Sequence, residues 1–477
     1  MHGQIKLKRI GTDGLQPHLH PGPLMTDFLS GAAGTIEEYV QLGGYEVARR
    51  VALQMTSDEV IQSLEDAGLR GRAGGGYPTS HKWWLVARQE AAEKYFICNA
   101  NAGQPGGFKE RFLLSANPHR IIEAVITGAL AVGASHVLIA LPRQLTEQAH
   151  VLEKALGQAR QYGFVGDGVF NSGTRLDVSV YRTTGEYIIG EETALLDLIE
   201  GNAGQPRVKP PLPTARGLFG APTVVNNLET VLQAHYILKV GVDSYREVGP
   251  PNAPGTLIFS LSGHVKRPGL YELPLGTTVR EIIFEYGQGI LDGSAVKAVF
   301  PGGVSSPVLG PQTLDLRLDF DSLREVESDL GSGVVIVVAE GTCMVRLATQ
   351  LAEFFHETSC GKCQPCKDGT HRTHVMLNHI NRLDEKSIDR IDKALPASPR
   401  KRMLTVINSA PAGVSYTDTA RGLDKIRHLC EFYKYRGDCH HSTEAANSIQ
   451  SLLSQFADEF ESHRVNLECN HERLLKV

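Results

Sequence analysis

Three cysteines stand close together in the segment 359–369, at C-x2-C-x2-C spacing: Cys360, Cys363 and Cys366. Thiolates spaced in this way can converge on one iron–sulfur cube whose fourth ligand comes from elsewhere in the chain. Zinc is the competing metal, although zinc motifs usually pair two C-x2-C units or one unit with histidines. Pro365, beside the last cysteine, and the lack of a second pair favour a [4Fe–4S] cluster. Zinc and three incidental thiols remain the alternatives.

A second stretch with chemical potential is the glycine-rich segment 68–79. Five of the nine residues from 68 to 76 are glycine, which disfavours a stable helix or strand. Such a loop lets backbone N–H groups approach a ligand, and Arg70, Arg72 and Lys82 stand nearby to meet anionic oxygens. A loop that is merely flexible has the same composition, so this segment is weak evidence by itself.

Two adjacent acids, Glu191 and Glu192, stand where a helix is expected to begin. The simpler explanation is that they complement the helix dipole. The functional alternative is hydrogen bonding to the ribityl chain of a flavin or to a nucleotide ribose. A stiff, proline-rich segment follows at 206–213 and carries two cations, Arg207 and Lys209.

Strand-like and helix-like patterns alternate through the first half of the chain. This order indicates an α/β layer with a largely parallel sheet, on which ligands bind at the carboxyl ends of the strands. The loops 99–111 and 185–193 follow expected strands and are therefore the expected ligand loops. The expected elements are strands at Tyr95–Asn99, Val137–Leu141 and Leu176–Tyr181 and helices at His119–Val132, Val151–Tyr162 and Asn226–Val231.

Length and composition set broad limits. The chain has 477 residues, enough for several domains, and 48 basic against 53 acidic residues give a net charge of −5. This balance, without a long basic stripe, indicates no nucleic-acid partner. The polar N-terminus lacks the core of a secretory signal, and no apolar stretch is long enough to cross a bilayer. Eight unevenly clustered cysteines favour a reducing compartment, the cytoplasm, with docking on a membrane complex through a partner left open.

Composition also suggests domain boundaries. Residues 1–35 are expected to form an arm with little regular structure, and residues 36–248 to form the α/β domain. A small α+β module is expected over 249–335, behind a linker rich in proline and glycine. Residues 336–477 are helical in pattern and hold the cysteine triplet. Inside them, residues 381–422 are charged and broken, which favours a solvated insertion over a basic docking patch.

Five motifs occur in an order that resembles one family, the flavin- and NADH-binding 51-kDa subunits of respiratory complex I. The diaphorase subunits of NAD-linked hydrogenases and formate dehydrogenases belong to the same family. The resemblance covers nearly all of residues 30–470. The motifs are Gly68–Trp83, Cys98–Arg111, Gly185–Leu196, Gly201–Thr230 and Ser359–Gly369.

The resemblance implies a Rossmann-like α/β domain that binds FMN, then a β-grasp module, then a helical bundle with one [4Fe–4S] cluster. It implies hydride exchange between NADH and FMN and single-electron transfer through the cluster to partner subunits, with NADP(H) as the other candidate dinucleotide. Flavin belongs between NADH and the cluster, because nicotinamide gives up two electrons at once whereas a cluster accepts one, and flavin can do both. The implied partners are a thioredoxin-like [2Fe–2S] subunit and further iron–sulfur or catalytic subunits.

The family's site residues carry over by position. Glu192 and Lys209 would approach NADH. The cluster would use the cysteine triplet and a fourth thiolate, for which Cys439 fits better than Cys430, because the family places this ligand in a loop between helices. No role is evident for Cys343 and Cys469. The implied FMN contacts are Gly71, Arg72, Gly74, Lys82, Asn99, Tyr187, Gly190, Glu191, Asn226, Asn227 and Thr230.

The chain departs from the family pattern around the nucleotide. Three positions that are usually acidic hold Asn101, Ala102 and Gln104, so repulsion against phosphate and acceptors for ribose hydroxyls are both reduced. Three aromatic positions that flank the adenine are also changed, two of them to leucine, and Ala73 replaces a glycine. The changed aromatic positions are Tyr77, Leu85 and Leu212.

Three functions follow from these observations. The first is an NADH:acceptor oxidoreductase subunit. The second keeps fold and cluster but prefers NADPH, with Lys209 or Arg207 near its 2′-phosphate. The third is an electron-relay subunit that oxidises no dinucleotide, against which Lys82, Tyr187 and Glu191 argue because they match flavin-binding positions.

Overall fold

The computed structural model describes residues 18–30, 35–101, 103–381, 421–466, 469 and 475. The chain forms two compact units, Lys8–Ala339 and Glu340–Lys476. Most of the insertion expected at 381–422, and Ala102, lie outside the described residues. Within the described part of the chain, no helix combines the length and the apolar character needed to cross a membrane.

The first unit is built around a four-stranded parallel sheet with the order β4-β3-β2-β5. The central strand β2, Tyr95–Asn99, is apolar at consecutive positions because parallel strands are covered on both faces. The carboxyl ends of β2, β4 and β5 carry Asn99, Thr183 and Asn227. The other strands are β3 (His136–Pro142), β4 (Asp177–Thr183) and β5 (Thr223–Asn227).

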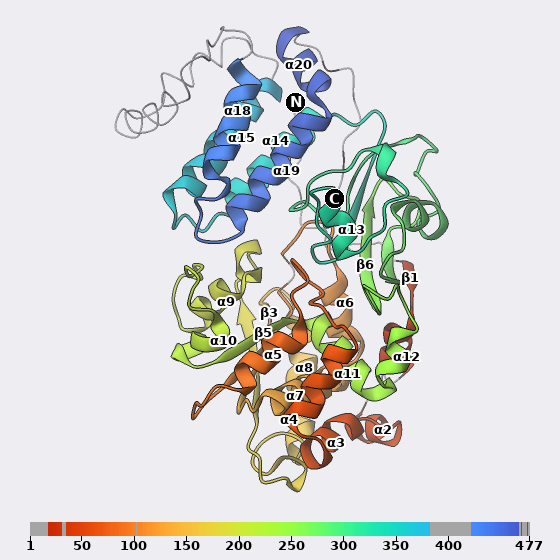
Figure 1. The fold of residues 1–477 in the computed structure, drawn as a ribbon, viewed down its shortest axis with the longest axis vertical. Helices are drawn as coiled ribbons and strands as arrows, with labels where there is room; N and C mark the ends of the chain where they lie inside the picture. Colours follow the sequence, from red (N-terminus) through yellow and green to blue (C-terminus); the bar gives the residue numbers. More distant parts are fainter. Residues whose placement is uncertain are drawn as a thin grey trace. The chain divides into compact units, whose positions relative to one another are not determined.

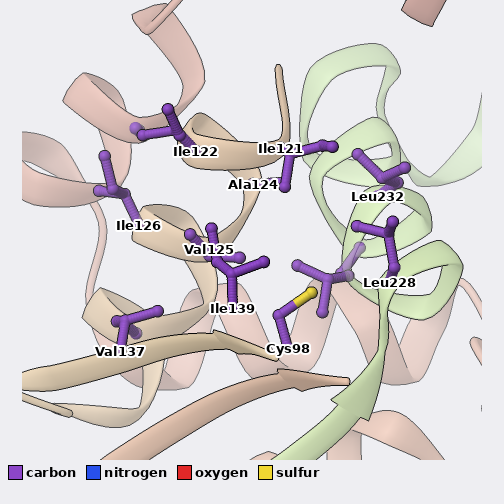
Figure 2. Close-up of a cluster of buried hydrophobic side chains, with 14 of the residues drawn as sticks. Cys98, Ile121, Ile122, Ala124, Val125, Ile126, Val137, Ile139, Leu228 and Leu232 are labelled. Carbon is purple, nitrogen blue, oxygen red and sulfur yellow. The ribbon is translucent and has the colours of Figure 1, made fainter. Parts of the chain in front are cut away.

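Helix α7, Pro118–Val132, lies in the middle of the core beside the sheet. The side chain of Asn117 accepts a hydrogen bond from the backbone N of Arg120 and caps its start, and Gly133 ends it in the left-handed region (φ +69°). Figure 2 shows apolar side chains of α7, α11 (Leu228–Val240) and the sheet converging around Cys98. Cys98 is fully buried, as the sequence predicts.

Most of the remaining helices of this unit pack around the same core (Figure 1). Helix α4 begins with the expected cap, because Thr56 and Glu59 form a capping box. The helix expected at Asn226–Val231 starts two residues later, since Asn226 and Asn227 still belong to β5. The helices are α2 (Ile36–Gln41), α3 (Glu46–Gln54), α4 (Ser57–Asp66), α5 (Thr79–Ala87), α6 (Lys109–Ala116), α8 (Thr146–Gln161), α9 (Glu192–Ile199), α10 (Pro213–Arg216) and α12 (Val242–Arg246), with short helical turns at Val169–Asn171, Tyr187–Gly190 and Leu218–Gly220.

The expectation that residues 1–35 lack regular structure is wrong where the structure describes them. Strand β1, His18–His20, pairs in parallel with β7, and helix α1, Pro23–Ser30, buries Phe28. The carboxylate of Glu272 accepts hydrogen bonds from the backbone N atoms at the start of α1, at 2.9 and 2.6 Å. This partner lies about 250 residues away in sequence, so local patterns could not reveal the helix.

A second sheet of the same unit has the order β1-β7-β6-β9-β8 and its own apolar core. Strands and helices are interspersed in this part of the unit, as expected for an α+β module, and the helix Glu281–Tyr286 is of the π type. The elements are β6 (Thr256–Gly263), β7 (Gly269–Pro274), the π-helix Glu281–Tyr286, β8 (Val296–Phe300), a turn at Pro311–Thr313, α13 (Phe320–Glu325) and β9 (Val334–Ala339).

The second unit is a bundle of helices. Gly369 allows α15 and α18 to approach closely, because a Cβ built at this position would lie 2.2 Å from the ring of Tyr433. The described helices are α14 (Met344–Glu357), α15 (Gln364–Asn381), α18 (Arg421–Lys434), α19 (His441–Gln455) and α20 (Ala457–Asn466).

Candidate functional site

The glycine-rich segment forms a closed loop in front of the parallel sheet. The backbone N of Gly71 donates to the O of Tyr77 at 2.9 Å, and that of Thr79 donates to the O of Leu69 at 3.0 Å. Gly74 adopts φ +69°, and a Cβ built on Gly74 or Gly75 would meet no atom within 4 Å. The loop therefore presents bare backbone to open space, which suits close approach by an anionic cofactor.

Two of the three cations expected to meet anionic oxygens point elsewhere. The guanidinium of Arg72 is buried, with Nη2 donating to the hydroxyl of Tyr245 at 2.8 Å. The guanidinium of Arg70 pairs with Asp321 at 3.1 Å. Both were expected to face the ligand because the sequence shows charge but not direction. Only the backbone of Arg72 stays near the loop, where its N donates to Thr230 Oγ1 at 2.8 Å.

Lys82 belongs to a line of alternating charges that joins three segments. Its Nζ donates to the backbone O of Val225 at 3.0 Å and lies 3.4 Å from Glu192 Oε2. Lys209 Nζ contacts Glu192 Oε1 at 2.7 Å and Glu191 Oε1 at 2.9 Å. The structure therefore brings together four of the residues that the sequence singled out.

The charges in this line keep one another ionised. Burial alone would raise the pKa of Glu192, but Lys82 and Lys209 lower it below its usual value. Burial alone would lower the pKa of Lys209, but Glu192 and Glu191 raise it. At neutral pH both groups are charged, which suits the orientation of a polar ligand.

Glu191 also has the simpler of its two expected roles. Its Oε2 accepts hydrogen bonds from the backbone N atoms of Thr193 and Ala194, each at 2.8 Å, and so caps α9. Its other oxygen remains on Lys209. Both carboxylate oxygens of Glu191 are therefore engaged, which holds the side chain in one orientation beside Glu192.

Polar side chains at the strand ends are held by the protein itself. Asn99 Nδ2 donates to the O of Gly190 at 3.1 Å, which joins the end of β2 to the turn that contains Tyr187. Asn226 Oδ1 accepts from Trp83 Nε1 at 2.8 Å. Asn227 Oδ1 accepts from the backbone N of Glu229 at 2.9 Å and caps α11. These bonds fix the rim of the site.

A buried ionic cluster below this rim was not predicted. Lys109 Nζ lies 2.7 Å from Glu229 Oε2 and 4.0 Å from Glu110 Oε1. It also donates to the backbone O of Ser332 at 2.8 Å and that of Arg72 at 3.3 Å. The available signal was two charged residues inside the expected ligand loop 99–111, Lys109 and Glu110, and a third, Glu229, just after the Asn–Asn pair. The cluster ties the glycine-rich loop to the second sheet.

The two described amides that replace acids both donate to carbonyl groups. Gln104 Nε2 donates to the O of Gly302 at 2.9 Å, and its Oε1 accepts from Ser332 Oγ at 2.9 Å. Asn101 Nδ2 donates to the O of Glu186 at 3.1 Å. An ionised carboxylate cannot donate, so these amides form contacts that the family's usual acids could not.

The changed aromatic positions border the outer side of the site. Tyr77 is 48% exposed and its ring lies 6.0 Å from Lys82 Nζ, while Leu212 is 45% exposed. Arg207 is engaged with Glu200, at 2.5 Å, and with the backbone O of Gly217. It is therefore less available for a 2′-phosphate than the sequence suggests.

In the helical unit, the cysteine triplet spans the connection from α14 to α15. Cys366 lies in the first turn of α15, 3.7 Å from Ser359 Oγ. Burial raises the pKa of its thiol to about 12, and the neighbouring Cys363 and Cys360 add to the effect. None of the three forms a disulfide, and this set of thiols fits an iron–sulfur cluster.

The position of the fourth ligand can be compared for its two candidates. Lys362 Nζ pairs with Asp438 Oδ2 at 3.2 Å, which brings the residue before Cys439 next to the triplet. Cys430 is fully buried and lies 3.5 Å from the hydroxyl of Tyr433. A histidine beside a cluster ligand is expected to face solvent, but His441, two residues after Cys439, is buried, and its Nε2 contacts the backbone O of Phe355 at 2.8 Å.

Comparisons with known proteins agree with the division of the chain. The FMN-binding domain model of the 51-kDa subunit matches residues 64–236. The SLBB domain model matches residues 258–308. The iron–sulfur binding region of NADH-ubiquinone oxidoreductase F matches 346–398 and 400–463.

Whole proteins match as well. The F 2 subunit of NADH-quinone oxidoreductase in Rhizobium meliloti is 42% identical over 345 residues, 72% of this chain and 82% of the relative. The HndC subunit of the NADP-reducing hydrogenase in Solidesulfovibrio fructosivorans is 35% identical over 435 residues, 91% of this chain and 82% of the relative.

Among solved structures, a chain of the NAD⁺-reducing [NiFe]-hydrogenase in its H₂-reduced state superposes with a TM-score of 0.77. It is 28% identical, and the match covers 96% of this chain and 70% of that chain. The folded parts of the chain thus have counterparts in proteins that carry flavin and iron–sulfur domains. The chain belongs to the family of FMN-binding 51-kDa subunits that includes the F subunits of NADH-quinone oxidoreductases and the diaphorase subunits of hydrogenases.

Proposed function

We propose that this chain exchanges hydride between NADH and FMN and passes single electrons through a [4Fe–4S] cluster to partner subunits. The observation that carries the proposal is the charged line Lys82–Glu192–Lys209–Glu191 beside an open glycine-rich loop, at the carboxyl ends of a parallel sheet. Bound FMN would supply the conversion between two-electron and one-electron chemistry, and the cluster would supply single-electron transfer.

In this proposal the chain contributes binding and placement rather than proton transfer. Gly71 and Gly74 would let the phosphate end of FMN approach their loop closely, with Lys82 as the nearby cation. The N–H of Gly71 is already used by the O of Tyr77, so the open part of the loop at Gly74 and Gly75 would face the phosphate. Asn99 and Gly190 would border the flavin, since their mutual hydrogen bond defines the gap between two strand-end loops. Holding the nicotinamide over the flavin in one orientation is the main catalytic effect available to such a site.

Glu192 and Lys209 are proposed to receive the dinucleotide. Both side chains are charged, and both are held in position by further contacts. Glu192 lies at the start of α9, which Glu191 caps, and Lys209 forms salt bridges with both Glu191 and Glu192. Glu192 offers an acceptor for ribose hydroxyls, and Lys209 offers a cation for the diphosphate. The cluster is proposed to use Cys360, Cys363, Cys366 and Cys439.

The test is an anaerobic titration of the FMN-loaded protein with NADH and, separately, NADPH. Bleaching of the flavin absorption near roughly 450 nm by NADH is expected. Lys209→Met should weaken NADH binding by about 10- to 150-fold, because a charge-assisted contact contributes about 1.5–3 kcal/mol. Lys239→Met is the matched control, since this lysine pairs with Asp27 instead. Flavin that stays oxidised with both dinucleotides would refute the proposal and favour an electron-relay subunit.

NADPH is the second candidate because amides replace acids at Asn101 and Gln104. Fewer negative charges reduce repulsion against a 2′-phosphate. Arg207 pairs with Glu200, and Lys209 pairs with Glu191 and Glu192, so a 2′-phosphate would compete with carboxylates for either cation. Bleaching by NADPH alone would establish this alternative.

We further propose that the chain works in the cytoplasm beside a thioredoxin-like [2Fe–2S] subunit and other redox subunits. The names of its relatives, which are those of subunits, and eight unevenly clustered cysteines support this proposal. Anaerobic purification from the source cells should yield a complex whose EPR spectrum contains a [2Fe–2S] signal. Purification of the chain alone, with no such signal, would contradict it.

A further inference from the structure

Two cysteines without a role in the proposed electron path meet a histidine in the helical unit. Cys343 precedes α14, His463 lies on α20, and Cys469 follows that helix. One ligand atom of each lies within 4.8 Å of the other two. Cys343 Sγ is 3.6 Å from His463 Nε2, and both residues are buried.

We propose that Cys343, His463 and Cys469 bind a zinc ion that links the C-terminal segment to the start of α14. Two sulfur atoms and one imidazole nitrogen form a donor set that zinc prefers and that magnesium or calcium does not. A fourth position would be filled by water or by another side chain. The site is separate from the cysteines assigned to the iron–sulfur cluster.

Cys343 lies at the N-terminal end of α14, where a backbone N–H meets its sulfur. Its Sγ accepts a hydrogen bond from the backbone N of Arg346 at 3.4 Å, at the positive end of the 14-residue helix α14. Glu459 stands one turn before His463 on α20, and its Oε1 accepts from the backbone N of Met344 at 2.7 Å. Glu459 and His463 thus both face the start of α14, and this contact holds α20 in place for ligation.

A disulfide between Cys343 and Cys469 is the competing explanation. It would require an oxidant, and it would leave the buried imidazole of His463 without a function at the point where three ligand groups converge. Zinc uses all three groups and needs no oxidant. It also has a structural purpose here, because His463 lies 120 residues from Cys343 and the ion would connect the two ends of the helical unit.

The first experiment uses the wild-type protein, purified anaerobically with flavin and cluster in place. Elemental analysis should find about one zinc per chain in addition to iron. X-ray absorption at the zinc edge is independent of iron and should show sulfur at about 2.3 Å and nitrogen at about 2.0–2.1 Å. Absence of zinc would overturn the proposal. Zinc surrounded by four sulfurs would also overturn it, because the ion would then occupy the cluster cysteines.

Variants locate the ion. Cys343→Ser, His463→Gln and Cys469→Ser should each reduce bound zinc at least about tenfold while iron stays constant. Cys430→Ser is the matched control, a buried cysteine of the same unit outside the proposed site, and should keep its zinc. Cys469 is half-buried, so its variant remains informative if Cys343→Ser fails to fold. Zinc retained in the Cys469 and His463 variants, or an intact mass 2 Da lower that reveals a disulfide, would refute the assignment.

Discussion

Replacing Gln104 by glutamate restores the acid that is usual in the family, and we expect it to destabilise this protein. Gln104 Nε2 donates to the O of Gly302 at 2.9 Å and to Ser305 Oγ at 3.3 Å. A carboxylate would leave the carbonyl of Gly302 without this donor and would place a negative oxygen against it. The hydroxyl of Ser305 can rotate and donate instead, so that contact survives.

The expected loss in the free energy of unfolding follows from these contacts. An acceptor left unsatisfied in a partly buried position costs about 1–3 kcal/mol. The bond from Ser332 Oγ would become charge-assisted and recover about 1 kcal/mol. The expected net loss in the free energy of unfolding is about 1 kcal/mol, the middle of the resulting range of about 0–2 kcal/mol. For a domain with an m-value near 3 kcal/mol/M, this lowers the urea midpoint by roughly 0.3 M.

The assay is urea unfolding followed by tryptophan fluorescence. Both tryptophans, Trp83 and Trp84, lie on α5, so the signal reports on the unit that contains Gln104. Gln144→Glu is the control: this amide also donates to a carbonyl, that of Thr184 at 3.0 Å, but it is exposed. Its glutamate variant should shift stability by less than about 0.5 kcal/mol.

The pH dependence supplies an independent check. Glutamate at position 104 would have a raised pKa in the folded state, because the ionised form faces a carbonyl oxygen. The loss of stability should therefore be full at pH 8 and should vanish as the pH falls below the unfolded value of about 4.3, where the protonated group can donate again. An unchanged midpoint, or an equal shift in the Gln144 variant, would refute the role assigned to Gln104.

The remaining predictions concern the cluster, the core and the nucleotide. Cys439→Ser should abolish the EPR signal of the reduced [4Fe–4S] cluster and Cys430→Ser should retain it; the opposite result would reassign the fourth ligand. Burial alone would raise the pKa of Glu123, but His235, Tyr39 and Arg120 lower it to about 2. This group should therefore contribute about 3 kcal/mol of stability above pH 4.5, lost as the pH falls toward 2, so Glu123→Gln should flatten the acid limb of a stability–pH curve. Tyr77→Ala should weaken dinucleotide binding several-fold, because about 1 kcal/mol of stacking on the adenine is lost. Calorimetry measures this affinity, and an unchanged value would show that the adenine does not stack on Tyr77.

Several features were predictable because their physical cause is local. The spacing of Cys360, Cys363 and Cys366 is itself a ligand pattern. Continuous apolar runs such as Tyr95–Asn99 indicated a parallel sheet, since such strands are buried on both faces. The capping box at Thr56 and Glu59 is formed by residues three apart. Motif order then identified the family, which the comparisons confirmed.

Other features depend on the direction in which a side chain points and on partners that are distant in sequence, and only the tertiary structure determines both. Arg72 was expected to face a ligand, yet its guanidinium is held by Tyr245, 173 residues away. Helix α1 exists because Glu272 satisfies its first N–H groups. Sequence patterns record charge, spacing and local preference, whereas the direction of a side chain is set by whichever buried partner satisfies it. For the same reason Cys343, His463 and Cys469 carried no signal in sequence until folding placed them together.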